Sequence, residues 1–328
     1  MLGEMSCPRV ISLLPSATEI IHAIGRGDTL VGRSHECDFP PGVERLPAVS
    51  IARIDSDALD PGQIDAAVAA AIAHGEQLYG VSADALAELA PDVVVTQTLC
   101  RVCAVEGDGV RSALGAHALE AEVVELEPEG VEGVLASIVA LGDLLGAPGA
   151  ARVVVRSAHE RLASVRETVA GLPRPGVVVV EWTDPPYAAG HWVPELVEIA
   201  GGRELLGVAG TPSARATWEE IRHRAPEVVV IAPCGFDLDR TVAEATPGRL
   251  AGWLAGTPAL RDGRVWAIDA NAYLSRPGPR IVDGAELLAA ILHPGRAGPV
   301  PPTAAAAIQP TPLAAGRTSA LRPLQTPS

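Results

Sequence analysis

The chain has 328 residues, a formal net charge of −15 at pH 7 and a hydrophobic content of 48%. This length permits one large α/β domain or two moderate ones. The negative charge argues against nucleic acid as a partner, because phosphate binding requires basic patches. All 25 basic residues are arginine, which excludes lysine Schiff-base and P-loop chemistry. No apolar run is long enough to cross a bilayer, so no membrane span is expected.

The N-terminal stretch MLGEMSCPRV has neither a basic region nor an apolar region, so we expect no secretory signal peptide. The chain contains five cysteines, an odd number that fits a reducing compartment better than a disulfide framework. These two features predict a cytoplasmic location.

In the first half of the chain, short Val/Ile-rich runs alternate with helical patterns, as is typical of parallel sheets. Strands are expected at 9–14, 30–34, 92–96 and 122–126, and helices at 17–24, 60–73, 83–89 and 110–118. Ser16 and Glu19 have the spacing of a capping box, which predicts that both side chains stabilise the start of the first helix.

The longest helical pattern lies near the middle of the chain, at 131–172. Pro148-Gly149 interrupts it, so a shorter helix, a turn and a long helix are expected. Apolar residues of the long helix are spaced alternately by three and four and share one face: Val155, Ala158, Leu162, Val165 and Val169. This helix suggests two lobes held by a strut, with a cleft between them, and a core helix of one large domain fits the periodicity equally well.

The second half repeats the scheme of the first. Strands are expected at 177–181, 228–231 and 264–268, and helices at 193–199, 218–224, 238–244, 249–254 and 284–292. The expected division is therefore an N-terminal lobe at 8–130, a helical strut at 131–172, a C-terminal lobe at 173–293 and a tail at 294–328. The tail is rich in Pro, Ala and Thr without apolar periodicity, so it is expected to be disordered.

Ligands of open parallel sheets bind beyond the carboxyl ends of the strands. Side chains near these ends are the ligand-binding candidates: Ser16, Thr18, His35, Gln97, Trp182, Tyr187, His191, Trp192 and Phe236. The metal-binding candidates are the cysteines of the same loops: Cys37, Cys100, Cys103 and Cys234. Cysteines used only for packing would be expected inside strands and helices, so this placement points to a function.

Cys100 and Cys103 have the C-x-x-C spacing of half a zinc site or of a redox pair. His35 and Cys37 would complete a tetrahedral set if the two loops converge. The alternative is that these cysteines are buried packing thiols, and for Cys103 taken alone we favour it.

Trp182 and Tyr187 flank Asp184-Pro185-Pro186 in a polar, proline-rich loop. Large rings in such a loop suit a flat ligand, and a lid over the cleft is the alternative. His191-Trp192 opens a helix, where the pair either faces a ligand or lets Trp192 fill the seam between helix and sheet. Dinucleotide-binding, P-loop, α/β-hydrolase and zinc-protease motifs are absent from the sequence, so the protein is not expected to be an enzyme.

The segment RVISLLPSATEIIHAIG, at 9–25, resembles the opening of the substrate-binding proteins of iron-siderophore, heme and cobalamin importers, a class III periplasmic-binding-protein-like family. Further segments agree in order: LAELAPDVVVTQ ending at Gln97, HWVPELVEIAGG at 191–202, TWEEIRHRAPEVVVIAP at 217–233 and RDGRVWAID at 261–269. The resemblance covers residues 8–293. It implies two Rossmann-like lobes joined by one long helix, with the ligand in a shallow cleft.

Within this family the chain looks most like members called cobalamin-binding proteins, including ones with HECD-type, C-x-V-C and PCGF segments. The resemblance implies a corrinoid or related metal-chelate ligand, whose flat ring suits the aromatic loop. A His or Cys of the cleft would then approach the axial position of cobalt. An ABC transporter is implied as a partner only if the protein is exported. Glu219 or Glu220 would then dock onto the transporter. The lack of a signal and the cysteines depart from that pattern.

Three functions remain open at this point. The first is a non-catalytic binding protein for a corrinoid. The second is a metalloprotein or enzyme in which the His/Cys set holds zinc or an iron–sulfur cluster: His35, Cys37, Cys100, Cys103 and Cys234. The third is a sensor, whose closure on a ligand is detected by a partner.

Overall fold

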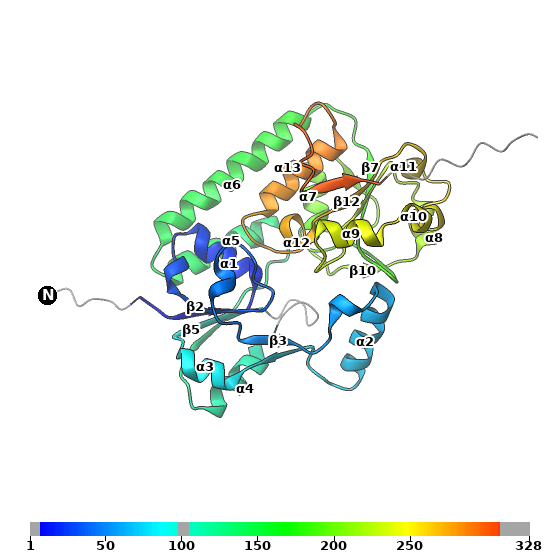
Figure 1. Ribbon diagram of the computed structural model, residues 1–328. Helices are drawn as coiled ribbons and strands as arrows, with labels where there is room; N and C mark the ends of the chain where they lie inside the picture. The colour runs from blue at the N-terminus through cyan, green and yellow to red at the C-terminus, as the bar shows by residue number, and fades with distance from the viewer. Residues whose placement is uncertain (1–6, 98–104, 106, 309–328) are drawn as a thin grey trace, which may run out of the picture.

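The computed structural model describes residues 7–97, 105 and 107–308. These residues form two α/β lobes connected by a pair of helices (Figure 1). The predicted fold of two lobes with parallel sheets is therefore confirmed. Cys100 and Cys103 lie outside the described residues.

The N-terminal lobe is built on a four-stranded parallel sheet in the order β2-β1-β5-β6. Its strands are β1 (Val10–Ser12), β2 (Leu30–Arg33), β5 (Val93–Thr96) and β6 (Glu122–Glu125). Its helices outside the arm defined below are α1 (Pro15–Ala23), η1 (Gly27–Thr29), η2 (Val43–Arg45), α3 (Ala83–Leu89) and α4 (Gly107–Ala116). The central strands β1 and β5 are buried along their whole length, as expected for Val/Ile-rich strands covered on both faces.

The capping box predicted at the first helix does not form. Helix α1 begins at Pro15, whose missing N–H is tolerated at a helix start, and the residue before it is Leu14, which has no side chain able to cap. Glu19 is therefore free of this role, and its carboxylate reaches the other lobe instead.

A part of the N-terminal lobe lies outside its main sheet. Strands β3 (Ser50–Ala52) and β4 (Tyr79–Val81) pair only with each other, as an antiparallel ribbon. The chain between them, residues 53–78, is called the arm here; it holds η3 (Ser56–Ala58) and α2 (Pro61–Ala73), which starts with a capping box of Asp60 and Gln63. Figure 1 shows α2 apart from α3 and α4 and close to the C-terminal lobe.

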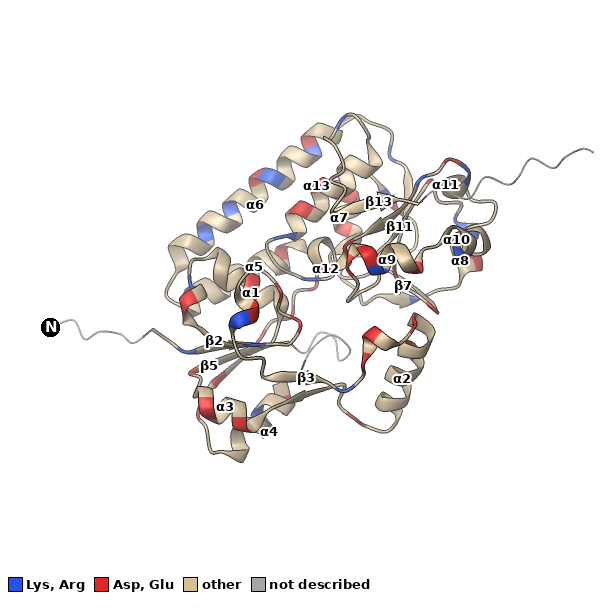
Figure 2. Ribbon diagram, in the orientation of Figure 1, with Lys and Arg blue, Asp and Glu red and all other residues tan. Residues whose placement is uncertain are grey.

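The strut consists of two helices, α5 (Val131–Leu144) and α6 (Pro148–Val169), so the predicted break at Pro148 is correct. Helix α5 packs against α1, and α6 packs against α13 of the C-terminal lobe. Ala158, Leu162, Val165 and Val169 are buried and Val155 is half-buried, as their spacing predicted. The arginines of α6 lie off this face (Figure 2).

The C-terminal lobe has a seven-stranded sheet in the order β10-β8-β7-β11-β12-β13, with β9 also paired to β7. Its strands are β7 (Gly176–Thr183), β8 (Pro186–Ala188), β9 (Arg203–Glu204), β10 (Ala214–Arg215), β11 (Val228–Ile231), β12 (Val265–Ile268) and β13 (Ala305–Ala307). Its helices are α7 (Val193–Ile199), α8 (Trp218–His223), α9 (Leu238–Glu244), α10 (Pro247–Trp253), α11 (Pro258–Arg261), α12 (Ala270–Tyr273) and α13 (Ile281–Leu292). The central strands β7, β11 and β12 are parallel, as predicted.

The prediction of a disordered tail from Pro294 is wrong for residues up to 308. Strand β13 pairs antiparallel with β12, with Ala305 opposite Ile268. Ala304 and Ala305 are buried. An alanine-rich segment lacks the periodicity that reveals a strand, but small side chains fit a closely packed sheet edge. Residues 309–328 lie outside the described chain.

The two lobes share a hydrophobic core along the strut. One cluster of buried side chains includes Ile21 of α1, Ile138 of α5, Leu162 of α6, Leu196 of α7 and Leu288 of α13. Two smaller clusters lie on the other faces of the two sheets. Among the described residues, none of the arm belongs to any of these three clusters. The described helices include none that is long and apolar enough to span a membrane.

Candidate ligand-binding site

The carboxyl ends of the parallel strands in the two lobes face each other. Segment 34–39 follows β2 in the N-terminal lobe, and segment 269–280 follows β12 in the C-terminal lobe; hydrogen bonds connect the two. Together with 182–187 and 234–236, which lie at the ends of β7 and β11, these segments form what is called the interlobe face here. The rule that ligands bind at such strand ends makes this face the candidate site.

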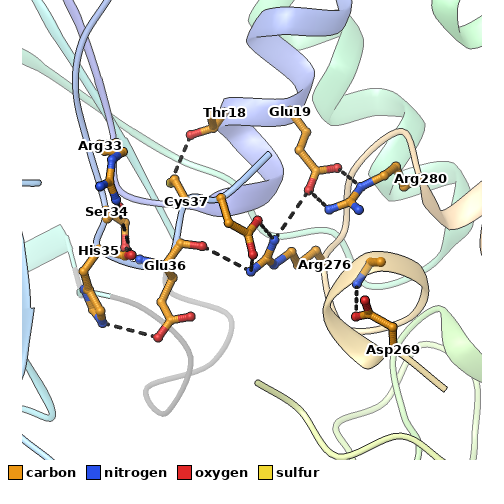
Figure 3. A network of polar contacts seen from close by, with 12 residues as sticks. Thr18, Glu19, Arg33, Ser34, His35, Glu36, Cys37, Asp269, Arg276 and Arg280 are labelled. Carbon is orange, nitrogen blue, oxygen red and sulfur yellow. Dashed lines mark hydrogen bonds and ion pairs between the residues drawn. The ribbon is translucent and has the colours of Figure 1, made fainter. Parts of the chain in front are cut away.

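Four charged side chains, called the clasp here, connect the lobes at this face: Glu19, Asp38, Arg276 and Arg280. Glu19 is 4% exposed. Its two oxygens accept hydrogen bonds from Nε of Arg280 at 2.9 Å and from Nη2 at 2.5 Å. Figure 3 shows this pairing, with Arg276 on the other side of the carboxylate. Because both donors are charged and the geometry is bidentate, this is a strong type of hydrogen bond.

Arg276 extends the clasp to the segment after β2. It forms an ion pair with Asp38, and its Nη2 donates to the carbonyl of Glu36 at 3.1 Å (Figure 3). Its Nη1 also lies 3.9 Å from Oε1 of Glu19. Arg280 covers the ring of Phe39, with its guanidinium carbon 4.2 Å from the ring centre. The clasp therefore fixes segment 36–39 against the C-terminal lobe.

Ser16, predicted as a ligand-binding residue, lies at a close approach of the two lobes. It is 2% exposed. A β-carbon placed on Gly278 would lie 3.4 Å from the backbone of Ser16, an ordinary van der Waals distance, so the 276–280 loop lies against the start of α1. Ser16 therefore contacts protein rather than an open face.

His35 is half-buried on the N-terminal side of the interlobe face. Its Nδ1 lies 2.7 Å from Oγ of Ser50, and its ring lies 5.6 Å from the ring of Tyr79. Its Nε2 lies 3.4 Å from Oε1 of Glu36. The hydrogen bond to His35 and the charges of His35 and Arg276 lower the pKa of Glu36. His35 is thus oriented by Ser50, and Figure 3 shows its ring directed at the carboxylate of Glu36.

Thr18 and Cys37 form a buried pair behind the face. Oγ1 of Thr18 lies 2.8 Å from Oγ of Ser12 and 3.1 Å from Sγ of Cys37. Cys37 is 2% exposed, and burial raises the pKa of its thiol. The thiol of Cys37 is thus packed and hydrogen-bonded, and its assignment as a metal ligand stays a prediction. Gln97 is also buried, at the end of β5.

The predicted aromatic loop is a β-hairpin. Trp182 and Tyr187 lie opposite each other on β7 and β8 and are both half-buried. The ring of Phe236, which follows β11, contacts Trp182 edge to face with 5.5 Å between the centres. Phe236 itself is 3% exposed and supports Trp182 from behind. Trp182 and Tyr187 are therefore the aromatic side chains available at this end of the sheet.

His191 and Trp192 do not lie with this hairpin. Strand β8 runs antiparallel to β7 and carries the chain back toward the amino-terminal half of β7, where the N–H of Ala189 donates to the carbonyl of Val179. Trp192 is 5% exposed within the shared core, and its indole N–H donates to the carbonyl of Leu274 at 2.7 Å. His191 lies against it, and burial lowers its pKa. Trp192 thus fills the seam between helix and core, which was the second of the two predictions for this pair, and the assignment of His191 stays a prediction. The sequence did not reveal that the loop reverses.

A second connection between the lobes, called the latch here, consists of Arg240 and Trp182. Arg240, on α9, donates to the carbonyls of Ser56 at 2.6 Å and Leu59 at 3.4 Å in the arm. The indole N–H of Trp182 donates to the carbonyl of Pro61 at 3.2 Å. The guanidinium carbon of Arg240 lies 3.8 Å from the ring centre of Phe236.

The described residues contain no group of three or more His, Cys, Asp or Glu side chains placed to hold a metal ion. Cys234 is exposed after β11. Its backbone N–H donates to the carbonyl of Glu181 at 3.0 Å. The zinc or iron–sulfur hypothesis thus has no support from His35, Cys37 and Cys234.

One buried carboxylate lies away from the interlobe face. Oε1 of Glu204 accepts the backbone N–H groups of Leu205, Leu206 and Gly207, each at 3.1 Å. Burial raises the pKa of Glu204 to about 7, against the lowering effect of these backbone hydrogen bonds. These donors are backbone amides, so Glu204 differs from Glu19, which has a cation at hydrogen-bond distance.

The charged residues that connect the lobes were not among the predicted site residues: Glu19, Asp38, Arg240, Arg276 and Arg280. A signal for two of them was present. The loop after the last parallel strand contains Arg276-Pro277-Gly278-Pro279-Arg280, and the strand-end rule places it at the same edge as the other candidates. The arginines of such a loop are expected to find carboxylates or a ligand there.

Comparison with known proteins agrees with this fold. A family model described as periplasmic binding protein matches residues 10–272. The Vitamin B12-binding protein of Vibrio cholerae serotype O1 is 23% identical over 281 residues, covering 85% of this chain and 86% of that protein. The Cobalamin-binding protein of Halobacterium salinarum is 25% identical over 290 residues, covering 87% of this chain and 69% of that protein.

The crystal structure of a periplasmic heme-binding protein from Pseudomonas aeruginosa has a TM-score of 0.67 to this chain at 22% identity, covering 88% of this chain and 94% of that one. This likeness shows a common fold. The match to the family model extends over most of the sequence, from the first strand to α12. The chain therefore belongs to the periplasmic binding protein family.

Proposed function

We propose that this substrate-binding protein takes a corrinoid as its ligand, held at the interlobe face with its ring system near Trp182 and Tyr187. The related proteins of Vibrio cholerae and Halobacterium salinarum carry names that refer to vitamin B12 and cobalamin. The heme-binding structure of the same fold makes heme the main competing ligand. The choice between them depends on the charge of the site.

The observation that carries the proposal is that three described arginines of this face, Arg33, Arg276 and Arg280, are already paired within the protein, whereas Arg215 is exposed opposite Tyr187 on β10. Arg280 is paired with Glu19, and Arg276 with Asp38 and the carbonyl of Glu36. Arg33 donates to the carbonyls of Glu44 and Leu46. A heme presents two carboxylates, and many iron chelates are anionic, so these ligands would need a free cation. A corrinoid presents mainly neutral amides at its edge, which need hydrogen bonds rather than charge.

The free-energy cost of separating one of these arginines from its carboxylate also favours a corrinoid over heme. Drawing Arg280 to a ligand carboxylate would leave Glu19 buried without its partner, which costs several kcal/mol. A neutral ligand leaves the clasp intact. The indole of Trp182 and the phenol of Tyr187 offer apolar area with polar tips, which suits a flat ring that carries polar groups.

The proposal is tested by isothermal titration calorimetry with cyanocobalamin and, separately, with hemin. We expect one equivalent of cyanocobalamin to bind with a Kd in the micromolar range or below, and hemin to bind at least tenfold more weakly. Tighter binding of hemin would contradict the argument from paired arginines. Serum albumin, a protein of unrelated fold, serves as the control for nonspecific binding of hemin.

The partner, the location and a metal site are not addressed by the geometry of the interlobe face. Membership of the family implies an ABC transporter as partner, and for this chain that partner is a proposal. The cytoplasmic location, the sensor hypothesis and a metal site at Cys100 and Cys103 stay predictions from the sequence.

A further inference from the structure

The helical part of the arm (residues 53–78) is connected to the opposite lobe. Helix α2 packs against β7 of the C-terminal lobe. Of its residues, only Pro61 and Ile64 are buried. A β-carbon on Gly62 would lie 2.7 Å from Oδ2 of Asp184, so the start of α2 approaches the tip of the aromatic hairpin closely. The arm therefore extends from the N-terminal lobe across to the hairpin.

The hydrogen bonds that hold the arm come from two C-terminal-lobe side chains. Besides the bonds to Ser56 and Leu59, Arg240 donates to Oδ1 of Asp57 at 3.3 Å, and that carboxylate is 93% exposed. Three of the four acceptors are backbone carbonyls: Ser56, Leu59 and Pro61. Water can satisfy each of them when the latch is released, so opening leaves no buried charge without a partner.

The base of the arm offers a place for movement. Strands β3 and β4 form a two-stranded ribbon outside the main sheet; Tyr79 and Val81 of β4 pack against the N-terminal core, whereas the arm extends beyond the ribbon. Since no arm residue belongs to a hydrophobic cluster, movement of the arm leaves the core of either lobe intact. Regions with few buried apolar contacts are the ones that open locally at low free-energy cost.

The latch also contacts the aromatic side chains at the interlobe face. Trp182 donates to the arm and lies at the face, and Phe236 contacts both Trp182 and Arg240. A ligand that settles against Trp182 therefore meets the side chain that holds the arm closed.

We propose that the arm is a lid over the interlobe face, which opens as a unit on the β3–β4 ribbon and is held closed by Arg240 and Trp182. Ligand enters and leaves past the opened arm, so the strength of the latch sets the rates of both steps. The opening of the arm is proposed for the ligand-free protein. The identity of the ligand that passes the arm rests on the proposed function.

The first experiment follows hydrogen–deuterium exchange of the ligand-free protein by mass spectrometry. In Arg240→Ala, we expect the amides of α2 to exchange at least tenfold faster than in wild type, with those of α13 unchanged. Arg222→Ala is the matched control, because Arg222 makes the same kind of bond to the carbonyls of Gly252 and Trp253 within one lobe. Exchange in α2 that is unchanged in Arg240→Ala, or raised equally in the control, would overturn the lid.

The second experiment measures cyanocobalamin binding by stopped-flow tryptophan fluorescence. We expect both the association and the dissociation rate constants to rise at least fivefold in Arg240→Ala. A rise in the dissociation rate constant alone would mean that Arg240 holds the ligand directly and would overturn the gating role. If wild-type protein binds no cyanocobalamin, the proposed ligand is wrong, and the exchange experiment alone decides whether the arm opens.

Discussion

The clasp and the latch both cross between the lobes, yet they are built from different chemistry. The clasp places the carboxylate of Glu19 in a buried position and surrounds it with two guanidinium groups, next to the core that the lobes share. The latch joins Arg240 mainly to backbone carbonyls, on the side where the arm contributes to no hydrophobic cluster. A buried charge that loses its partner is costly, whereas an exposed carbonyl is hydrated at once. The clasp therefore fixes the two lobes together, whereas the latch can be released.

The largest effect is expected from Glu19→Ala. It leaves Arg276 and Arg280 without their buried carboxylate, so the free energy of unfolding should fall by about 3–5 kcal/mol. Urea unfolding followed by circular dichroism measures this change.

The matched control is Glu132→Ala, which removes a carboxylate that is 77% exposed and contacts His159. It should lower the free energy of unfolding by less than about 1 kcal/mol. Equal effects of the two variants would mean that the clasp is not a fixed connection.

Glu204 can be compared with Glu19, because its carboxylate accepts hydrogen bonds from backbone amides rather than from an arginine. Its pKa of about 7 in the folded protein lies above the ordinary value of 4.5, so the folded state binds a proton more tightly than the unfolded state. The stability that this proton provides is present below pH 4.5 and is lost as the pH rises through 7. The loss amounts to about 3 kcal/mol.

Glu204→Gln removes this titration while it keeps the shape of the side chain. Relative to the variant, the wild type should therefore become less stable between pH 4.5 and pH 8, which urea unfolding across that range measures. A difference between the two proteins that stays constant with pH would show that Glu204 is ionised throughout.

Trp182→Ala tests the side chain that the latch and the proposed site have in common. Loss of its ring should weaken cyanocobalamin binding by roughly tenfold or more, or about 1.4 kcal/mol, as measured by calorimetry. Trp253→Ala is the control, since Trp253 stacks on Trp218 with 4.5 Å between the ring centres rather than on the hairpin. Equal affinity of Trp182→Ala and wild type would place the ligand elsewhere.

The smallest effect on stability is expected from Arg240→Ala. Since Arg240 bonds to Ser56, Asp57 and Leu59, which are exposed or half-buried, the free energy of unfolding should fall by about 1 kcal/mol or less. A loss as large as that of Glu19→Ala would show that the arm is a structural brace. Urea unfolding at one pH, in parallel with Glu19→Ala, makes this comparison.

Local patterns predicted much of the fold. The spacing of Leu162, Val165 and Val169 gave the buried face of α6, and Pro148 marked its start, because these signals depend only on helix geometry. The Val/Ile runs gave the parallel strands. The hairpin at Trp182 was missed, since the reversal at Asp184–Pro185 turns one strand into two without a change in composition.

The candidate site was predicted only in part. The strand-end rule found His35, Trp182 and Tyr187, which do lie near the ends of their strands. It did not find the partner of Glu19, because Arg280 lies 261 residues away and no local pattern connects the two. The burial of Cys37 beside Thr18 has no local signal either, because it is a property of the packed structure.

Strand β13 has a consequence for how this protein behaves beside copies of itself. It covers the outer edge of β12 with the backbone of Ala305–Ala307. Without it, the Val/Ile-rich β12 would end the sheet as an open edge, and open edges recruit strands from other chains and promote aggregation. A version of the chain that stops near Pro294 should therefore be less soluble than the full one, even though it keeps every residue of the family match. The alanine-rich segment thus protects the sheet against self-association.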